Sequence, residues 1–356
     1  MSDDEDSTCY DGPKIDHDRR ANQRWTKRRK LTEKQQIRLS YRLHDTAFFD
    51  QRHLLYAFLT NAANINVNAV NVNATLGKHG MTPLHVACRH GADKHRVADC
   101  AKLLIEYGAH VNAQDHHNRT PLHMACLLHN EEAAETVAQL LIENGASVDM
   151  VDKNGMSPLH LTCAKADGTL AKLLITKGSS VSEEDRNGQT PFHWICAVGF
   201  PGPDLLEAFV SKDECILEYS DKKGDTPLHL ACARAVASEQ VVKLLLDQHS
   251  ANIDAKNRQQ ETPLHKALAA GNLGVAGLLI TRNADWKCKT ATGWTCLHMA
   301  SKSGLDAMEL LLAHGAVVED DAKTNCGRTH LHLAAENNHV DLVFFLLQKY
   351  PLFEMQ

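Results

Sequence analysis

Histidine and cysteine are the side chains of this chain best suited to chemistry, because twenty-two histidines and eleven cysteines occur among 356 residues. Both residue types bind zinc, whose protein ligands must all lie about 2.0–2.3 Å from one ion. The sequence does not combine Cys-x-x-Cys or His-x-x-x-His pairs into a set of zinc ligands, and His116-His117 lies in a polar turn. The sequence therefore predicts no metal site and no cofactor.

Eight of the histidines instead belong to a recurring four-residue motif. The copies are Thr82-Pro83-Leu84-His85, Thr120-Pro121-Leu122-His123, Ser157-Pro158-Leu159-His160, Thr190-Pro191-Phe192-His193, Thr226-Pro227-Leu228-His229, Thr262-Pro263-Leu264-His265, Thr295-Cys296-Leu297-His298 and Thr329-His330-Leu331-His332. Successive copies begin 38, 37, 33, 36, 36, 33 and 34 residues apart. A nearly fixed period of this length is typical of a stacked repeat array.

Five cysteines occupy one position of the repeat, three residues after the motif histidine: Cys88, Cys126, Cys163, Cys196 and Cys232. Equivalent residues of neighbouring repeats should lie about 8–10 Å apart. A disulfide needs Cα atoms within about 7 Å. We therefore expect these cysteines to act as small apolar residues that pack one repeat against the next.

Each repeat carries signals for two helices and a loop. Threonine or serine is a good N-cap, and proline is tolerated at the first helical position. A second apolar run such as Val137 to Ile142 predicts a second helix, which ends at a residue such as Gly145 that can adopt left-handed backbone angles. Short extended pieces and turns such as Asp152-Lys153-Asn154-Gly155 then predict a hairpin-like finger.

The Thr-Pro-Leu-His-x-Ala motif and its spacing resemble the ankyrin repeat. The resemblance implies an all-α solenoid of helix pairs with β-hairpin-like fingers. It predicts eight repeats over 81–350, a degenerate capping repeat over 44–80, a helical lead-in over 31–43 and a C-terminal tail over 351–356. The histidine of each motif should tie its helix to the preceding finger.

The N-terminal arm, 1–30, is acidic and then basic. Residues 1–18 carry seven acidic side chains and a single lysine, which predicts a solvated, disordered segment. Lys27, Arg28, Arg29 and Lys30 follow. This basic run predicts either a nuclear localisation signal or a simple basic arm, and the sequence does not distinguish them.

Motifs for catalysis are absent from the sequence. It has no Gly-x-x-x-x-Gly-Lys-Ser/Thr loop, no Gly-x-Gly-x-x-Gly, no Gly-x-Ser-x-Gly and no His-Glu-x-x-His. Shallow repeats also lack the deep pocket that catalysis usually needs. No apolar run reaches the roughly 18 residues of a membrane span. We expect a non-enzymatic, intracellular protein, cytoplasmic or nuclear or both, that binds protein partners and neither nucleic acid nor membrane.

The last two repeats resemble the inhibitor-of-NF-κB family. The segments that carry this resemblance are Gly293-Trp294-Thr295-Cys296-Leu297-His298-Met299-Ala300-Ser301 and Asn325-Cys326-Gly327-Arg328-Thr329. The resemblance implies an interaction scaffold that binds and regulates a Rel-type transcription factor. Two other functions stay open: an adaptor or substrate receptor for a ubiquitin ligase, and a regulatory subunit of an enzyme complex.

The partner should lie along the finger tips and the exposed side of the first helices, which form one strip in a stacked array. Because the tips are mostly basic although the net charge is −6, an acidic or phosphorylated partner segment is favoured. Trp294 is predicted as a hot spot unless it packs on its neighbouring finger. The predicted strip contains His116, His117, Arg119, Lys153, Met156, Arg186, Gln189, Lys222, Lys223, Asp225, Arg258, Gln260, Trp294 and Arg328.

One finger asparagine suggests a modification. The segment Leu103-Leu104-Ile105-Glu106-Tyr107-Gly108-Ala109-His110-Val111-Asn112 is similar to the one in which ankyrin proteins are hydroxylated on the finger asparagine. This similarity makes Asn112 the hydroxylation candidate.

Overall fold

The computed structural model describes residues 42, 43, 45, 47, 71–75, 78–89, 94–199, 202–234, 239–247, 249–318 and 323–349. Within them the chain forms eight successive helix pairs. The first helices of the pairs are α3 (Pro83–Arg89), α5 (Pro121–Cys126), α7 (Pro158–Ala164), α9 (Pro191–Val198), α11 (Pro227–Cys232), α13 (Pro263–Ala269), α15 (Cys296–Ser303) and α17 (His330–Glu336). The second helices are α4 (Lys94–Glu106), α6 (Glu131–Glu143), α8 (Gly168–Thr176), α10 (Pro203–Val210), α12 (Glu239–Asp247), α14 (Leu273–Thr281), α16 (Leu305–Ala313) and α18 (Val340–Lys349).

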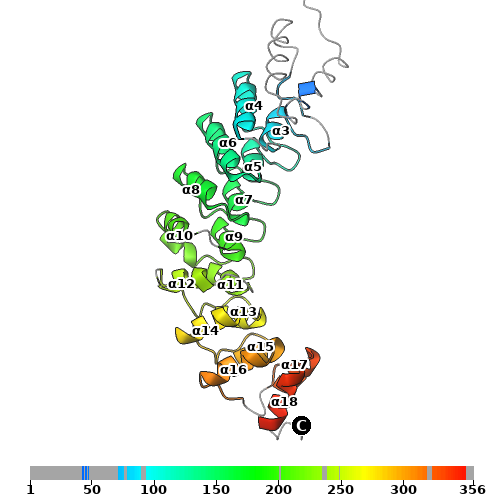
Figure 1. Cartoon of the computed structure of the whole chain (residues 1–356), viewed down its shortest axis with the longest axis vertical. Helices are drawn as coiled ribbons and strands as arrows, with labels where there is room; N and C mark the ends of the chain where they lie inside the picture. The colour runs from blue at the N-terminus through cyan, green and yellow to red at the C-terminus, as the bar shows by residue number, and fades with distance from the viewer. Residues whose placement is uncertain are drawn as a thin grey trace, which may run out of the picture.

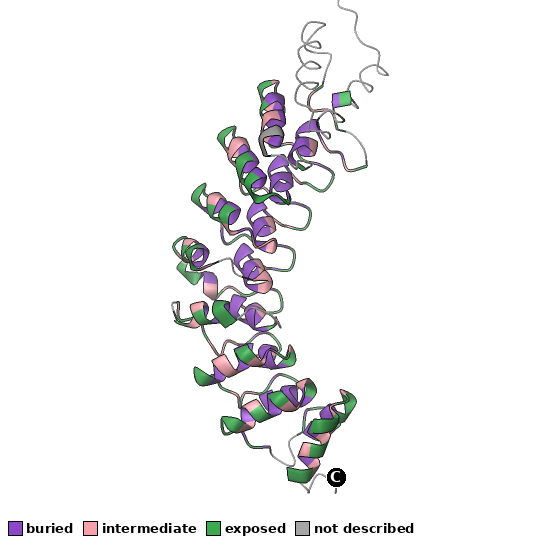
Figure 2. Ribbon diagram, in the orientation of Figure 1, coloured by how far each residue is buried: buried purple, intermediate pink, exposed green. Residues whose placement is uncertain are grey.

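The pairs stack into an elongated, curved column with the first helices in one layer and the second helices in the other (Figure 1). Each first helix packs on the next first helix, and within every pair except α9 and α10 the two helices also pack closely on each other. Figure 2 shows that the buried residues concentrate on the first helices and on the inner side of the second ones. The expected all-α solenoid of helix pairs is confirmed.

The first helices begin where their caps can be satisfied. In α5, the Thr120 side chain accepts a hydrogen bond from the His123 backbone, and the His123 ring accepts one from the Thr120 N–H at 3.1 Å. This reciprocal arrangement is a capping box in which histidine takes the place of the usual glutamate or glutamine. Pro121 stands at the first helical position, where a missing N–H costs nothing.

The cysteines of the repeated position are buried between neighbouring first helices, as the period predicts. Cys88, Cys126, Cys163, Cys196 and Cys232 are free thiols with 0–1% of their surface exposed. Burial raises the pKa of the Cys126 thiol to about 12, so the reactive thiolate is strongly disfavoured. They act as apolar packing residues.

The fingers are built from turns rather than regular strands. Among the described residues regular strands are absent, and Lys289 and Thr295 form an isolated antiparallel bridge. Each finger is instead closed by side-chain hydrogen bonds, which are described with the candidate surface below. The hairpin-like fingers expected from the sequence are therefore tight, hydrogen-bonded loops.

The fourth repeat departs from the pattern of the other repeats. Helix α10 begins after Gly202, which has no side chain to cap it, and a short 3₁₀ helix, η2 (Glu214–Leu217), follows it. Ile216 of η2 is buried, and the Tyr219 hydroxyl donates to Asp213 at 2.7 Å. Among the described residues, α10 and α12 pack together less closely than any other successive pair of second helices.

Several predictions from the sequence fall on residues outside the described part of the chain. These include the arm 1–30 with Lys27, Arg28, Arg29 and Lys30, most of the lead-in 31–43 and the tail 351–356. In the lead-in and the capping repeat, Leu43 and Ala47 are helical and buried.

The irregular fourth repeat should open before its neighbours. We expect amides of 196–220 to exchange with solvent faster than those of 120–178, because each repeat depends on its neighbours for stability and α10 has weak support on one side. Hydrogen exchange followed by mass spectrometry measures this directly. Equal protection of the two segments would contradict the prediction.

Candidate protein-binding surface

Each finger is organised around one inward-pointing polar side chain at its base. The Asp152 carboxylate accepts hydrogen bonds from the backbone N–H groups of Asn154 at 2.7 Å and Met156 at 3.0 Å. The same pair of bonds is made by the residues at equivalent positions, Asp115, Asp185, Asp221 and Asn257. These side chains are buried, so the fingers direct their acidic groups inward.

Backbone hydrogen bonds join each finger to the next. The Lys153 N–H donates to the His117 carbonyl at 2.8 Å, and the Arg186 N–H donates to the Asn154 carbonyl at 2.9 Å. The row continues through bonds donated by Lys222, Arg258, Ala291 and Asn325. Because neighbouring tips are hydrogen-bonded to one another, the finger tips form one continuous and ordered strip.

Five of the motif histidines connect their helix pair to the following repeat. Since His123 Nδ1 accepts from the Thr120 N–H, the ring proton is on Nε2, which donates to the Met156 carbonyl at 3.1 Å. The same bond to the next finger is made by His85 to Arg119, His160 to Gln189, His193 to Asp225 and His229 to Glu261. The expected structural role is found, but the inter-repeat bond runs forward to the next finger, not to the preceding finger.

Most of the predicted strip residues are exposed on these tips. The exposed side chains are those of His116, His117, Lys153, Arg186, Lys222, Lys223, Arg258, Gln260 and Arg328. Three of them also bond within the chain: His116 Nδ1 donates to the Lys78 carbonyl at 3.1 Å, Lys222 Nζ donates to the Arg186 carbonyl at 2.7 Å, and Arg328 pairs with Glu336. The strip therefore presents cations on successive fingers.

Asp225 does not belong to the exposed strip. It is 3% exposed, and its carboxylate accepts from Asn257 Nδ2 at 2.7 Å and pairs with Lys266 at 3.3 Å. The sequence suggested exposure because Asp225 follows a polar turn. The stacking of the next repeat over this turn buries the side chain instead.

Three further predicted residues are partly engaged inside the protein. Arg119 donates from Nε and Nη2 to the same oxygen of Asp115, Oδ2, at 3.0 and 2.7 Å, and Gln189 donates to Asp221 at 3.2 Å. Met156 is half-buried. The Arg119 and Gln189 side chains hold the fingers in place, and all three residues leave less of their surface for a partner.

Trp294 packs inward. Its indole is half-buried against the hydrophobic core, and its ring centroid lies 6.4 Å from that of His298 on α15. This packing gives the indole a structural role, so Trp294 is not a fully exposed ring, and its part in partner binding stays a prediction. A tryptophan that follows the finger turn packs on its own first helix, and sequence alone does not show that contact.

Sequence reasoning missed a column of bonds at the ends of the first helices. Lys165 Nζ donates to the Cys126 carbonyl at 3.1 Å, Arg234 to Ala197 at 2.8 Å and His339 to Lys302 at 2.7 Å. Each bond satisfies a carbonyl at the C-terminal end of the preceding first helix. Lys165 and Arg234, each five residues after its motif histidine, were the available signal.

Asn112 is exposed but engaged across a repeat junction. Its Oδ1 accepts from the Ser147 N–H at 2.8 Å, and its Nδ2 donates to the Gly145 carbonyl at 2.9 Å. The side chain is thus a bridge between repeats. Its hydroxylation stays a prediction.

Chemical sites of other kinds do not emerge from the described residues. No group of three or more His, Cys, Asp or Glu side chains there could hold a metal ion. No helix in that part of the chain is long and apolar enough to cross a membrane.

Paired helices in two layers, a hydrogen-bonded row of loops and a capping histidine per repeat define a helical-repeat solenoid. A family profile described as ankyrin repeats in three copies matches residues 43–139, 130–216, 195–290 and 275–354. The chain belongs to the ankyrin-repeat family, and is a protein-binding scaffold of that kind.

Shorter stretches are similar to named relatives. A 63-residue stretch, 18% of this chain, is 41% identical to the neurogenic locus Notch protein of Drosophila melanogaster but covers 2% of that protein. A 67-residue stretch, also 18% of the chain, is 36% identical to the NF-kappa-B inhibitor cactus of Drosophila yakuba and of Drosophila melanogaster, covering 14% and 13% of those proteins. The matches therefore span only a small part of each relative.

Removing a motif histidine should weaken the fold. We expect His123→Ala to lower the free energy of unfolding by about 1–2 kcal/mol, because both the cap and the bond to Met156 are lost. His123→Gln should lose less, since glutamine suits a capping box. Urea denaturation of the three proteins measures the difference, and an unchanged His123→Ala protein would refute the role.

Stability should fall on acidification below about pH 6.5. Burial lowers the pKa of His85, His123, His160, His193, His229 and His265. Between its lowered folded pKa and about 6.5, each histidine binds protons more readily in the unfolded chain, so stability is fully present above about 6.5 and decreases below it. Melting temperatures from pH 7.5 to 5 test this, and His123→Gln should show a smaller decrease. A flat profile would contradict it.

Proposed function

We propose that the finger strip binds an acidic or phosphorylated segment of a Rel-type transcription factor, and that the chain regulates this factor as an inhibitor-of-NF-κB-like scaffold. The observation that carries the proposal is the row of outward-facing cations on hydrogen-bonded fingers. Its central members are Lys153, Arg186, Lys222, Lys223 and Arg258.

Charge separation within each finger supports an acidic ligand. The carboxylates of Asp152, Asp185 and Asp221 face the backbone N–H groups of their own turns and are 5–9% exposed. The neighbouring lysines and arginines extend into solvent. A ligand that approaches the tips therefore meets positive charge, which speeds the association of an acidic segment and selects against a basic one.

Order in the strip also favours binding. Tips joined by backbone hydrogen bonds lose little conformational freedom when a ligand binds, so less of the interaction energy is spent on ordering them. Stacked repeats lie roughly 8–10 Å apart, and an extended segment could therefore contact several fingers in succession. The similarity to cactus, described as an NF-kappa-B inhibitor, and the resemblance of the last two repeats support a Rel-type partner.

Charge reversal on the strip tests the proposal. We expect Lys153→Glu combined with Lys223→Glu to weaken binding of a purified Rel-homology dimer by about 2 kcal/mol, because two contacts become repulsive. The melting temperature should change little, since both side chains are exposed at the tips. Isothermal titration calorimetry and thermal melting on the same samples measure both quantities.

A matched control uses exposed lysines of the second helices. Lys102→Glu combined with Lys172→Glu makes the same change in net charge away from the fingers, and binding should stay as in the parent protein. Equal weakening by both pairs would show that only overall charge matters. Full binding by the strip variant would remove the finger tips as the Rel-binding site.

A further inference from the structure

At four repeat junctions one side chain bridges to the following repeat. Asn73, Asn112, Asp149 and Asp254 each accept a hydrogen bond, through Oδ1, from a backbone N–H of the next repeat, at 2.6–2.9 Å. The two asparagines also donate to a glycine carbonyl of that repeat, Gly108 or Gly145. We call this interaction the junction clasp.

The clasp residue follows a short apolar segment that can be recognised in the sequence. It is the fourth residue in Ala109-His110-Val111-Asn112, Ala146-Ser147-Val148-Asp149 and Ala251-Asn252-Ile253-Asp254. In the seventh repeat the corresponding segment is Ala284-Asp285-Trp286-Lys287. Trp286 replaces the small β-branched residue, and Lys287 replaces the clasp residue.

Lysine cannot make the clasp, because an ammonium group donates hydrogen bonds and accepts none. Lys287 instead places its Nζ over the Trp286 ring, 5.2 Å from the centroid. The groups that a clasp would satisfy here are the Val317 N–H and the Gly315 carbonyl. Within the described part of the chain neither has a hydrogen-bond partner.

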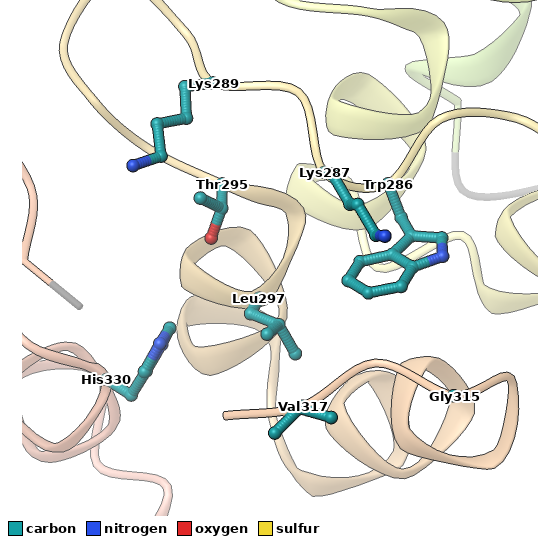
Figure 3. Close-up of a pocket in the computed structure, with 8 residues that line it drawn as sticks. All are labelled: Trp286, Lys287, Lys289, Thr295, Leu297, Gly315, Val317 and His330. Atoms are coloured by element: carbon teal, nitrogen blue, oxygen red, sulfur yellow. The ribbon is translucent and has the colours of Figure 1, made fainter. Parts of the chain in front are cut away.

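Both groups border a cavity of about 450 Å³ between the last two repeats, in which Trp286, Lys287, Lys289 and Leu297 also take part (Figure 3). Val317 exposes 67% of its surface, an unusually large share for an apolar side chain in this protein. The cavity therefore combines an apolar wall, two lysines and an unused backbone donor.

The inner end of the cavity is also unlike the other junctions. His330 stands where the first six repeats have proline, and its fully buried ring lines the cavity. Ser301, at the position that is cysteine in five repeats, lies 3.1 Å from His330 Nδ1. His330 Nε2 has no hydrogen-bond partner among the described residues. Beside this cavity, Ser301 and His330 thus place polar groups where the other junctions have apolar packing.

We propose that this cavity binds an acidic peptide segment of a protein partner. An aspartate carboxylate of the segment accepts a hydrogen bond from the Val317 N–H and pairs with Lys287 or Lys289. Within the chain, Asp149 and Asp254 accept equivalent bonds from the backbone of their own next repeats. An apolar neighbour of that aspartate packs on Trp286 and Val317. The proposal concerns a site separate from the finger strip, and it does not depend on which protein binds the strip.

A carboxylate fits the cavity better than a carboxamide. Two lysines border the cavity, and the nearby Asp285 carboxylate is already engaged by the Lys287 N–H at 2.9 Å and the Cys288 thiol at 3.0 Å. Hydrogen bonds between a backbone donor and an ionised acceptor are also stronger than neutral ones.

The probes are three capped peptides, Ac-Gly-Leu-Asp-Gly-NH₂ and its versions with asparagine or alanine in place of aspartate. Titration of the deuterated, ¹⁵N-labelled full chain is followed by transverse relaxation-optimised NMR. We expect the aspartate peptide to shift the Val317 amide resonance and to bind about tenfold more tightly than the alanine peptide. Equal binding of the aspartate and alanine peptides would overturn the proposal.

The variant Lys287→Asn should occupy the Val317 N–H and the Gly315 carbonyl with a side chain of the protein itself. It should form the clasp seen at Asn112, shift the Val317 amide without peptide, and lose peptide binding at an equal or higher melting temperature. A loss of binding in a protein that is no less stable excludes misfolding as its cause. Lys102→Asn, the same substitution at an exposed lysine of α4 away from the finger strip, should bind as the parent does. Undiminished peptide binding by Lys287→Asn would also refute the proposal.

Discussion

The structure depends on the two hydrogen bonds made by the neutral, buried imidazole of the motif histidine. In one ring, Nδ1 accepts from the N-cap of its own helix and Nε2 donates to a carbonyl of the following finger, as His123 does with Thr120 and Met156. A single side chain thereby sets where a helix begins and how far away the next repeat lies. Burial holds the ring neutral by lowering its pKa, and only the neutral form can both accept and donate.

This bond explains why the solenoid tolerates variation elsewhere. Five junctions have the bond to the next finger, from His85 to His229, although their repeats differ in length and the fourth contains an added 3₁₀ helix. Beyond His229 the arrangement changes. His330 replaces the initial proline, its ring lies 4.3 Å from that of His298, and burial lowers its pKa to about 3. The last junction is therefore held by a different set of contacts and leaves a cavity.

The finger strip and the cavity show two ways in which a repeat array can present a binding surface. The strip repeats one design, in which an inward carboxylate orders the turn and an outward cation meets solvent. The cavity lies at the junction where the clasp is missing. Lys287 cannot bond to the backbone groups there that Asn112 bonds to at its own junction. Repeated fingers produce a long surface whose successive parts are alike. A substitution at one junction produces a single local site.

The sequence by itself determined the repeat, the helix pairs, the capping motif and the buried cysteines, because each depends on local spacing or on a period that one chain displays. It also located most exposed tip cations, since these flank polar turns. Only the tertiary structure decided the direction of the histidine bond, the burial of Asp225, the inward packing of Trp294 and the missing clasp at Lys287. These features depend on which group of the neighbouring repeat faces a side chain, and that is set by stacking between residues more than thirty positions apart.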